Sequence, residues 1–338
     1  MIRFAVAIWV LFLPGFFSLV TRAQTNSIQA AAMNQAIEWS SAEVQYVAGL
    51  PDSKPKEKGT LSLSNEGFQF TGRSSSSRIS RQSILAVGTG DERIELWGKK
   101  GQILRAVIPN GGGIAAAMVM HHRVDMLTVE FSDPTGGYHG AVFFLPAQEA
   151  TRALESFRRT SRAADELQSN FCKDSFVRPR SILLALPNWT QVEVPPAYRA
   201  LVYERLYERL SKMKGIDHVY RAGERSVGLG CPESTMQLTI SAFKEGNQVK
   251  RASLGPVGMF VGTTALKFEA TVTDASKQVA LREQLQVTVR GEDESMTVAN
   301  SAAKKLTKHY SKVLKKATKS EVANAANLPR EPSQGVKQ

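Results

Sequence analysis

A glycine-rich stretch is the most suggestive chemical pattern in the chain. Residues 111–116, with the sequence GGGIAA, fit the spacing G-x-G-x-x-A and follow an apolar run at 103–108. In a dinucleotide-binding fold such glycines let the backbone approach a pyrophosphate, and an acidic residue such as Glu130 binds the ribose. Pro109 and Asn110 lengthen the turn, however, and the following strand predicts a hairpin instead of a βα unit. The stretch therefore favours a glycine-rich linker, and we expect no cofactor.

Histidines near carboxylates offer a second kind of site, a metal centre. His121 and His122 are followed by Asp125 and His139. Adjacent histidines on a strand point to opposite faces, so one site rarely uses both. The chain has no HExxH or HxH spacing. We therefore expect surface or loop histidines and no metal site.

Hydrolysis would need either a serine on a sharp turn with His and Asp partners, or a pair of carboxylates. No G-x-S-x-G motif occurs. The carboxylates that could form a pair have the character of solvated surface charges: Glu66, Glu92, Glu95, Asp217 and Glu224. We expect a non-catalytic protein, with an unrecognised hydrolase as the remote alternative.

The chain has two cysteines, Cys172 and Cys231. In an oxidising compartment such a pair is a disulfide candidate. Closing a loop of this size would stabilise the fold by roughly 4 kcal/mol on the chain-entropy model. The spacing fits neither a CxxC redox site nor a zinc knuckle. Two buried thiols, or one reactive thiol, are the less favoured alternatives.

The strongest charge feature is the segment 299–319, whose spacing predicts an amphipathic helix. Its apolar stripe is rich in alanine: Ala299, Ala302, Leu306, Tyr310, Val313 and Ala317. Lysines occupy the remaining surface: Lys304, Lys305, Lys308, Lys312, Lys315, Lys316 and Lys319. Such a helix can bind anionic lipid or another polyanion. The favoured alternative is a helix packed on its sheet, with lysines that provide solubility, because the stripe contains no Trp or Phe.

The first residues predict export from the cytosol. Arg3 precedes an apolar run at 4–20, and Ala23 ends a short stretch of small residues. This three-part pattern is typical of a secretory signal peptide, with cleavage after Ala23. A retained membrane anchor is the alternative, but Pro14 interrupts the run, which is shorter than the roughly 20 residues of a spanning helix. No lipid-accepting cysteine follows, so we expect a periplasmic or secreted protein.

The composition is that of a globular protein with excess positive charge. Of 338 residues, 42% are hydrophobic and 22% are charged, and the formal net charge is +12. Loss of Arg3 and Arg22 with the signal would lower the charge to +10. Positive proteins favour anionic partners, and an exported one meets polysaccharide and phospholipid more often than nucleic acid. We expect no nucleic acid partner.

Short strands with glycine-rich turns dominate the first half, and a helix at 147–159 closes it. Period-two alternation and apolar runs predict strands at 44–50, 61–63, 68–70, 84–87, 93–97, 102–108, 124–131 and 138–145. In element order, and in the stretches GTLSLSNEGFQFTG and LTVEFSDPTGGYHGAVFFL, this half resembles a pleckstrin-homology-like or GRAM-like domain. The resemblance implies an antiparallel barrel capped by one helix. It also places Lys54, Lys56 and Lys58 where such domains often hold phosphoinositide, although a partner-binding or solvated loop is the favoured interpretation.

The second half predicts the order β-α-β, four strands and a final helix. The expected elements are a strand at 181–186, a helix at 195–213, and strands at 218–221, 236–243, 248–254, 265–273 and 279–289. The stretches ILLALPNW, VPPAY, LTISAFKEG and SLGPVGMFVGTTALKFEATVTDAS resemble an uncharacterised bacterial envelope family. That family is similar in fold to the amino-terminal domain of TolB and to curli-secretion lipoproteins. The resemblance implies no catalytic residues.

We therefore predict an α+β protein with a PH-like antiparallel β-barrel capped by one helix. An α/β sandwich with a mostly antiparallel sheet and a long C-terminal helix follows. The expected division is a signal peptide at 1–23, an N-terminal segment at 24–42, the PH-like domain at 43–160, a linker at 161–180, the sandwich at 181–320 and a disordered tail at 321–338.

The function we expect is non-catalytic binding or scaffolding in the bacterial envelope, with another envelope protein or assembly as partner. The alternative is a binder of anionic lipid or polysaccharide that acts through the lysine-rich helix.

Overall fold

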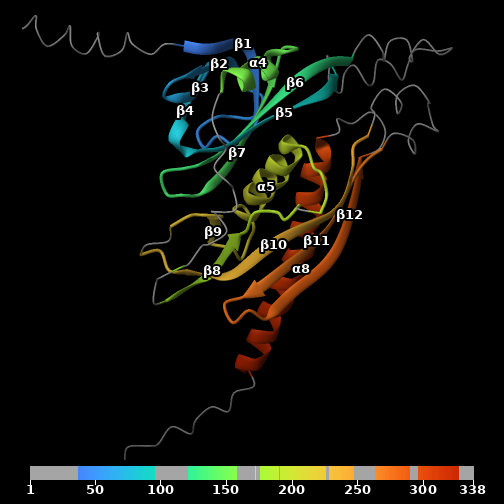
Figure 1. The fold of residues 1–338 in the computed structure, drawn as a ribbon. Coiled ribbons are helices and arrows are strands. Elements are labelled where there is room, and N and C mark those ends of the chain that lie inside the picture. Colours follow the sequence, from blue (N-terminus) through green and yellow to red (C-terminus); the bar gives the residue numbers. More distant parts are fainter. Residues whose placement is uncertain are drawn as a thin grey trace, which may run out of the picture. The chain divides into compact units, whose positions relative to one another are not determined.

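Alternating apolar residues build a seven-stranded antiparallel sheet in the order β4-β3-β2-β1-β7-β6-β5 (Figure 1). Its strands are β1 (Ile37–Ala48), β2 (Lys58–Ser64), β3 (Gly67–Gly72), β4 (Ser76–Ser80), β5 (Ile84–Glu95), β6 (His121–Ser132) and β7 (Tyr138–Leu145). A 3-10 turn, η1 (Arg81–Ser83), joins β4 to β5. The computed structural model describes residues 37–95, 121–157, 172, 176–189, 191–225, 228–246, 263–289 and 296–326. All of these belong to one unit, Ile37–Gln338.

The predicted hairpins of the first sheet are confirmed, but the sheet is open. Leu61 pairs with Phe70 and Leu63 with Phe68, and all four side chains are buried. No pairing between β4 and β5 closes a barrel among the strands described. Helix α4 (Glu149–Ser156), shorter than expected, packs on β1, β5 and β6 and buries Ala150 and Ala153.

The two strands expected at 84–87 and 93–97 are one strand, β5, which runs through Gly88 and Gly90. The prediction of two separate strands was therefore wrong. A Cβ on Gly88 would lie 2.6 Å from the ring of Pro196, so this glycine lets a helix approach the sheet. The expected strand at 102–108 and the stretch 111–116 lie outside the described residues.

A five-stranded mixed sheet follows, in the order β12-β11-β10-β8-β9. Its strands are β8 (Val177–Leu184), β9 (His218–Arg221), β10 (Cys231–Lys244), β11 (Thr264–Asp274) and β12 (Val279–Val289). β8 runs parallel to both its neighbours, β9 and β10, and the other pairs are antiparallel. β8 begins inside the expected linker, because its first residues pair with the start of β10. β10 pairs with β11, and the expected partner at 248–254 lies outside the described residues.

Two helices pack on this sheet, α5 (Pro196–Leu210) and α8 (Thr297–Ala326). α5 lies between the two sheets (Figure 1) and contacts β5, β6, β7, β9 and α8. Its buried residues face every direction, as expected of a helix enclosed on all sides. No helix of the described residues is long and apolar enough to cross a membrane.

One hydrophobic core spans both sheets. Val142 and Phe144 of β7 belong to the same buried cluster as Ile182 of β8 and Met236 of β10. At the closest approach, a Cβ on Gly140 would lie 2.5 Å from the Cβ of Ala200 in α5. The division into separate domains at 43–160 and 181–320 stays a prediction.

A buried ion pair between Arg221 of β9 and Glu204 of α5 joins the two sheets. The guanidinium donates to both carboxylate oxygens at 3.0 Å and to the carbonyl oxygen of Tyr138 in β7 at 2.8 Å. Glu204 also accepts the backbone N–H of Gly140 at 3.0 Å. Burial lowers the pKa of Arg221, but the charge and hydrogen bonds of Glu204 outweigh it and raise the pKa above its ordinary value. The pair thus links helix α5 to β7 of the first sheet and to β9 of the second.

Glu204→Gln should lower the free energy of unfolding by about 3–5 kcal/mol, because it leaves the Arg221 charge buried without its counterion. Arg123→Gln breaks the exposed Arg123–Asp91 pair and should change stability by less than about 1 kcal/mol. Denaturant unfolding of both variants measures the difference. Equal losses in the two variants would contradict the structural role of the pair.

Candidate functional site

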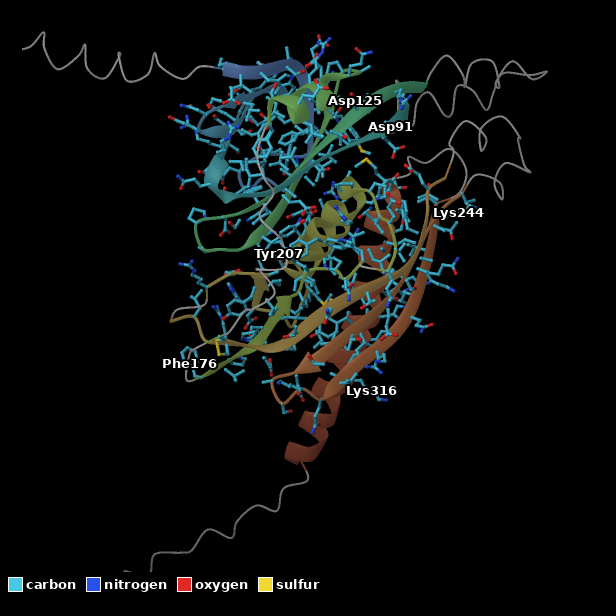
Figure 2. All side chains as sticks on the ribbon, in the orientation of Figure 1. Asp91, Asp125, Phe176, Tyr207, Lys244 and Lys316 are labelled. Atoms are coloured by element: carbon cyan, nitrogen blue, oxygen red, sulfur yellow. A yellow bond between two sulfur atoms is a disulfide. The ribbon has the colours of Figure 1, made fainter. Side chains whose placement is uncertain are left out.

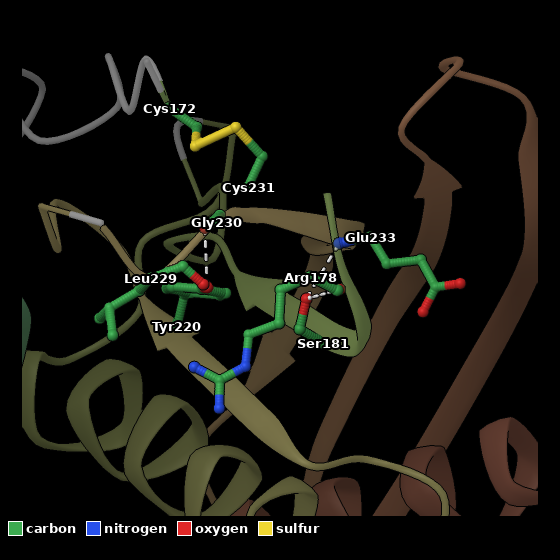
Figure 3. The surroundings of a disulfide bond; sticks show 8 residues. All are labelled: Cys172, Arg178, Ser181, Tyr220, Leu229, Gly230, Cys231 and Glu233. Atoms are coloured by element: carbon green, nitrogen blue, oxygen red, sulfur yellow. Dashed lines mark hydrogen bonds between the residues drawn. A yellow bond between two sulfur atoms is a disulfide. The ribbon is translucent and has the colours of Figure 1, made fainter. Parts of the chain in front are cut away.

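The disulfide predicted between Cys172 and Cys231 is present, with the two Cα atoms 5.4 Å apart. It joins the segment before β8 to the first residue of β10 (Figure 3). Tyr220 of β9 donates its hydroxyl to the carbonyl oxygens of Leu229 at 3.0 Å and Gly230 at 2.8 Å, which fixes the loop that leads to Cys231. The alternatives of two buried thiols or a reactive thiol were therefore wrong.

The parallel pairing beside the disulfide is held by a serine. Ser181 donates its hydroxyl to the carbonyl oxygen of Arg178 at 2.6 Å and accepts the N–H of Glu233 at 3.0 Å (Figure 3). These bonds bridge the irregularity in the register between Pro232 and Ser234. The disulfide thus sits on a hydrogen-bonded platform formed by β8, β9 and β10.

The lysine-rich helix predicted at 299–319 is α8, and it runs antiparallel to β12. Lys305 donates to the carbonyl oxygen of Gln286 at 2.9 Å, and one turn later His309 contacts Glu283 at 2.5 Å. The predicted apolar stripe is buried up to Tyr310: Ala299, Ala302, Leu306 and Tyr310. From 311 to 316 no described side chain is fully buried. Val313 and Leu314 still pack against the core, whereas Lys312, Lys315 and Lys316 are exposed.

The lysines of α8 form a positive face. Lys304, Lys308, Lys312, Lys315 and Lys316 are exposed, and Lys305 is half-buried. The side chain of Lys319 lies outside those described. No carboxylate of the described residues forms an ion pair with these lysines, and residues 297–320 contain no Asp or Glu. We call Lys304, Lys308, Lys312, Lys315 and Lys316 the lysine face.

Part of the lysine face borders a groove of about 740 Å³ between α8 and the turn after α5. The lining residues are Met213, Lys214, Gly215, Ser311, Lys312, Leu314, Lys315 and Lys316. The sequence predicts a helix at 195–213 but gives no sign that the turn after this helix, with Lys214 and Gly215, packs against α8. Gly215, with φ +92°, makes the tight turn that puts Lys214 beside the helix. The groove therefore has a basic rim and an apolar floor.

A second concave region lies between the first sheet and α5, as two adjoining cavities of about 700 and 640 Å³. Among its charged groups Arg205, Glu208 and Lys212 pair with one another, whereas Lys56 forms no ion pair within the described residues. Glu208 binds Lys212 at 2.8 Å and Arg205 at 3.1 Å, and these contacts lower its pKa, the Lys212 hydrogen bond most. Arg209 donates to Asn300 at 2.8 Å. This region differs from the lysine face, whose cations have no ion-pair partner among the described residues.

His139, predicted as a surface or loop histidine, is buried in β7. Its Nδ1 lies 3.1 Å from the carbonyl oxygen of Gly49 and its Nε2 lies 3.2 Å from Asp133. Burial raises the pKa of Asp133, but hydrogen bonds from His139, Thr135 and Gly137 outweigh it and hold the pKa well below its usual range. The side chains of His121 and His122 lie outside those described, and no cluster of three potential metal ligands occurs in the described part.

Four of the five carboxylates considered for hydrolysis have a local partner in the described part. Glu66 pairs with Arg78, and Asp217 pairs with Arg180. Glu224 accepts the N–H of Arg221.

Glu92 is buried and accepts from the Tyr198 hydroxyl at 3.3 Å and the N–H of Met296 at 3.2 Å, just before α8 begins. Glu95 lies outside the described side chains. The contacts of Glu92 anchor the start of α8, which is a structural role.

No family model and no curated protein matches the chain. Among solved structures, the hypothetical protein CT253 from Chlamydia trachomatis is similar at 12% identity and a TM-score of 0.23, over 32% of this chain and 70% of that one. Protein XCC0632 from Xanthomonas campestris, of DUF330, is similar at 11% identity and a TM-score of 0.27, over 47% and 93%. Both likenesses are to bacterial proteins, and neither assigns a function.

Reduction of the Cys172–Cys231 bond should slow the mobility of the denatured protein on a gel, because the 59-residue loop opens. Cys172→Ser with Cys231→Ser should lower the free energy of unfolding by roughly 4 kcal/mol. Unfolding of the intact protein and the double variant in denaturant, without reductant, measures this loss. Two alkylatable thiols in the protein isolated without reductant would contradict the bond.

Proposed function

We propose that the chain is an exported, non-catalytic binding protein of the bacterial cell envelope. Its binding surface is the lysine face of α8, which takes an anionic envelope component. From the sequence an envelope protein or assembly is the favoured partner, whereas the exposed lysines of α8 favour an anionic component. The observation that carries it is the row of exposed lysines without an ion-pair partner in the described part of the chain.

The spacing of the lysines supports a binding role over a solubility role. Lys304, Lys308, Lys312 and Lys316 follow one another at intervals of four residues, so they are neighbours on the helix surface. Like charges at this spacing each destabilise a helix by about 0.2–0.5 kcal/mol. A surface that served solubility alone would intersperse both signs of charge. An anionic ligand removes the repulsion, and the lysine face attracts it over a Debye length.

The disulfide supports export. Disulfides persist in oxidising compartments such as the periplasm and are rare in the cytosol. A signal peptide at 1–23 supplies the route, with cleavage after Ala23. The resemblances to PH-like domains and to the TolB-like envelope family fit a binding module in this compartment. A protein or assembly of the envelope remains the alternative partner.

Export is tested by fractionation of a Gram-negative host that expresses the full chain. The protein should be recovered from the periplasm with Gln24 as its first residue. A product that keeps residues 1–23 in the cytosolic fraction would refute the signal. A product that keeps them in the membrane fraction would favour the anchor.

Replacement of Lys304, Lys308, Lys312 and Lys316 by Gln should weaken binding to immobilised heparin, a soluble-polyanion probe. Each lysine contributes about fivefold in affinity near an anionic surface at low salt. The control replaces Lys54 and Lys56 of the β1–β2 loop and Lys58, the first residue of β2, by Gln. It removes three charges against four, so the salt shifts are compared per lysine. The first variant should elute at markedly lower salt than the control. Equal shifts would show that net charge, and not the lysine face, determines binding.

A further inference from the structure

One end of the five-stranded sheet gathers segments that lie far apart in the sequence. β8 and β10 begin there, because Val177 pairs with Cys231 in parallel register. β11 ends and β12 begins there, since Ser234 pairs with Asp274 and the next turn leads into Val279. α8 runs antiparallel to β12, so its free part approaches the same end. We call this region, with the Cys172–Cys231 bond and the turns around it, the disulfide end.

Exposed apolar side chains flank the disulfide. Six large apolar side chains are exposed in the described part: Phe176 at 52%, Val177 at 46% and Leu229 at 41% lie beside the Cys172–Cys231 bond, and Val279 at 52% begins β12, three strands away from β8. The other two, Ile37 and Leu154, belong to the first sheet and to α4. Single exposed apolar residues are ordinary, whereas a group on one end marks an interaction surface.

Phe176 is held rigidly in its exposed position. Its carbonyl oxygen accepts the N–H of Cys231 at 2.8 Å, and the disulfide ties Cys172, four residues earlier, to the same strand. Its ring lies over Gly230, where a Cβ would come within 2.5 Å of the ring carbons. Position 230 favours glycine because its φ is +83° and because a Cβ there would collide with the Phe176 ring. A pre-organised side chain loses little entropy on binding.

The lysines of the groove lie at the same end. Figure 2 labels Phe176 and Lys316, both toward the lower part of the second sheet. Lys214 and Lys312 border the groove with Lys316, over the apolar floor of Met213 and Leu314.

The carboxylates at the disulfide end differ in their partners. Asp217 pairs with Arg180, whereas Glu233 accepts the backbone N–H of Arg180 and Asp274 accepts from Ser276 and Gln278 within its turn, so these two contact neutral donors. The end therefore offers exposed apolar groups beside lysines without ion-pair partners in the described part.

We infer that the disulfide end docks on the surface of a membrane that contains anionic phospholipid. The inference rests on the proposed function, because it uses part of the same lysine face, and it names the ligand. The boundary between headgroups and acyl chains, where aromatic and apolar side chains are stable, takes up the exposed apolar groups Phe176, Val177, Leu229 and Val279. The groove lysines Lys214, Lys312, Lys315 and Lys316 bind the lipid phosphates.

The chemistry of the end favours lipid over a polysaccharide or an acidic protein. The groove lining contains only Lys, Met, Leu, Ser and Gly, without an aromatic or amide side chain to fix a sugar ring. Lysine is a point charge that attracts an anionic surface without a set geometry, whereas arginine suits bidentate recognition. The apolar groups come from three separate segments and reach outward, as interfacial binding requires.

Co-sedimentation with vesicles tests the inference on the mature chain with its disulfide intact. Vesicles of phosphatidylglycerol and phosphatidylethanolamine should bind the protein, and vesicles of phosphatidylcholine should not. Replacement of Lys214, Lys312, Lys315 and Lys316 by Gln should reduce partition by about fivefold per lysine. Phe176→Ser with Val279→Ser should also reduce the partition coefficient by at least about tenfold, because burial of the Phe side chain alone contributes about that factor. The matched controls are the Lys54, Lys56 and Lys58 to Gln variant and Ile37→Ser with Leu154→Ser, and both should bind as the parent does.

Insertion is read from the change in Trp fluorescence relative to the parent chain, whose mature form contains Trp39, Trp97 and Trp189. Phe176→Trp should be quenched by brominated acyl chains in anionic vesicles, and Ile37→Trp should not. This second measurement holds even if the serine variants fail to fold. Absence of quenching at position 176, or equal quenching at both positions, overturns the inference.

The two proposals fail separately. A protein that binds heparin through the lysine face but does not sediment with anionic vesicles overturns the membrane inference and leaves the proposed function intact. A protein that binds neither overturns both. Vesicle binding that is indifferent to both sets of substitutions at the disulfide end also overturns the inference.

Discussion

The buried pair of Arg221 and Glu204 is the interaction on which the rest of the arrangement depends. Removing two charges from water costs several kcal/mol per ion, so the pair is stable only when its donors and acceptors are satisfied. Arg221 meets this demand with Glu204 on one side and the Tyr138 carbonyl on the other, over the face of the Tyr207 ring at 3.7 Å. Gly140 donates to Glu204 in turn. Because these partners come from α5, β7 and β9, the pair ties both sheets to α5.

This fixed junction determines which part of α8 is free. Glu92 of the first sheet accepts the N–H of Met296, so the start of α8 is tied to the junction. The helix then follows β12 and stays buried up to Tyr310. Beyond that residue its lysines and the groove lie at the end of the sheet away from the junction. One end of the molecule therefore supplies rigidity, and the other carries the exposed groups that suit binding.

Local patterns predicted the elements, and tertiary contacts decided the rest. The strand pairs predicted at 61–70, 124–145 and 265–289 are confirmed by their registers. β11 and β12 alternate between buried and more exposed positions, whereas β7 is buried along its whole length, with a core cluster on each face. The division of β5 into two predicted strands was wrong, and the role of Gly88, which admits the ring of Pro196, depends on a contact distant in the sequence. The disulfide could be predicted because the chain has two cysteines, and the lysine-rich helix because its residue types and spacing lie in one segment. The apolar group with Phe176 was missed because its members have no common period and meet only through strand register.

The lysine face and the disulfide then have a common physical explanation. Three like-charged pairs at intervals of four destabilise α8 by about 1 kcal/mol in total. The helix tolerates this because Ala302, Leu306 and Tyr310 anchor its first turns in the core. Likewise, Phe176 exposes apolar surface that the fold would otherwise bury, and the Cys172–Cys231 bond holds it there. Local rules broken at one end and compensated elsewhere are typical of functional surfaces. The proposed partner would relieve both departures, because an anionic membrane would neutralise the lysines and cover the phenylalanine.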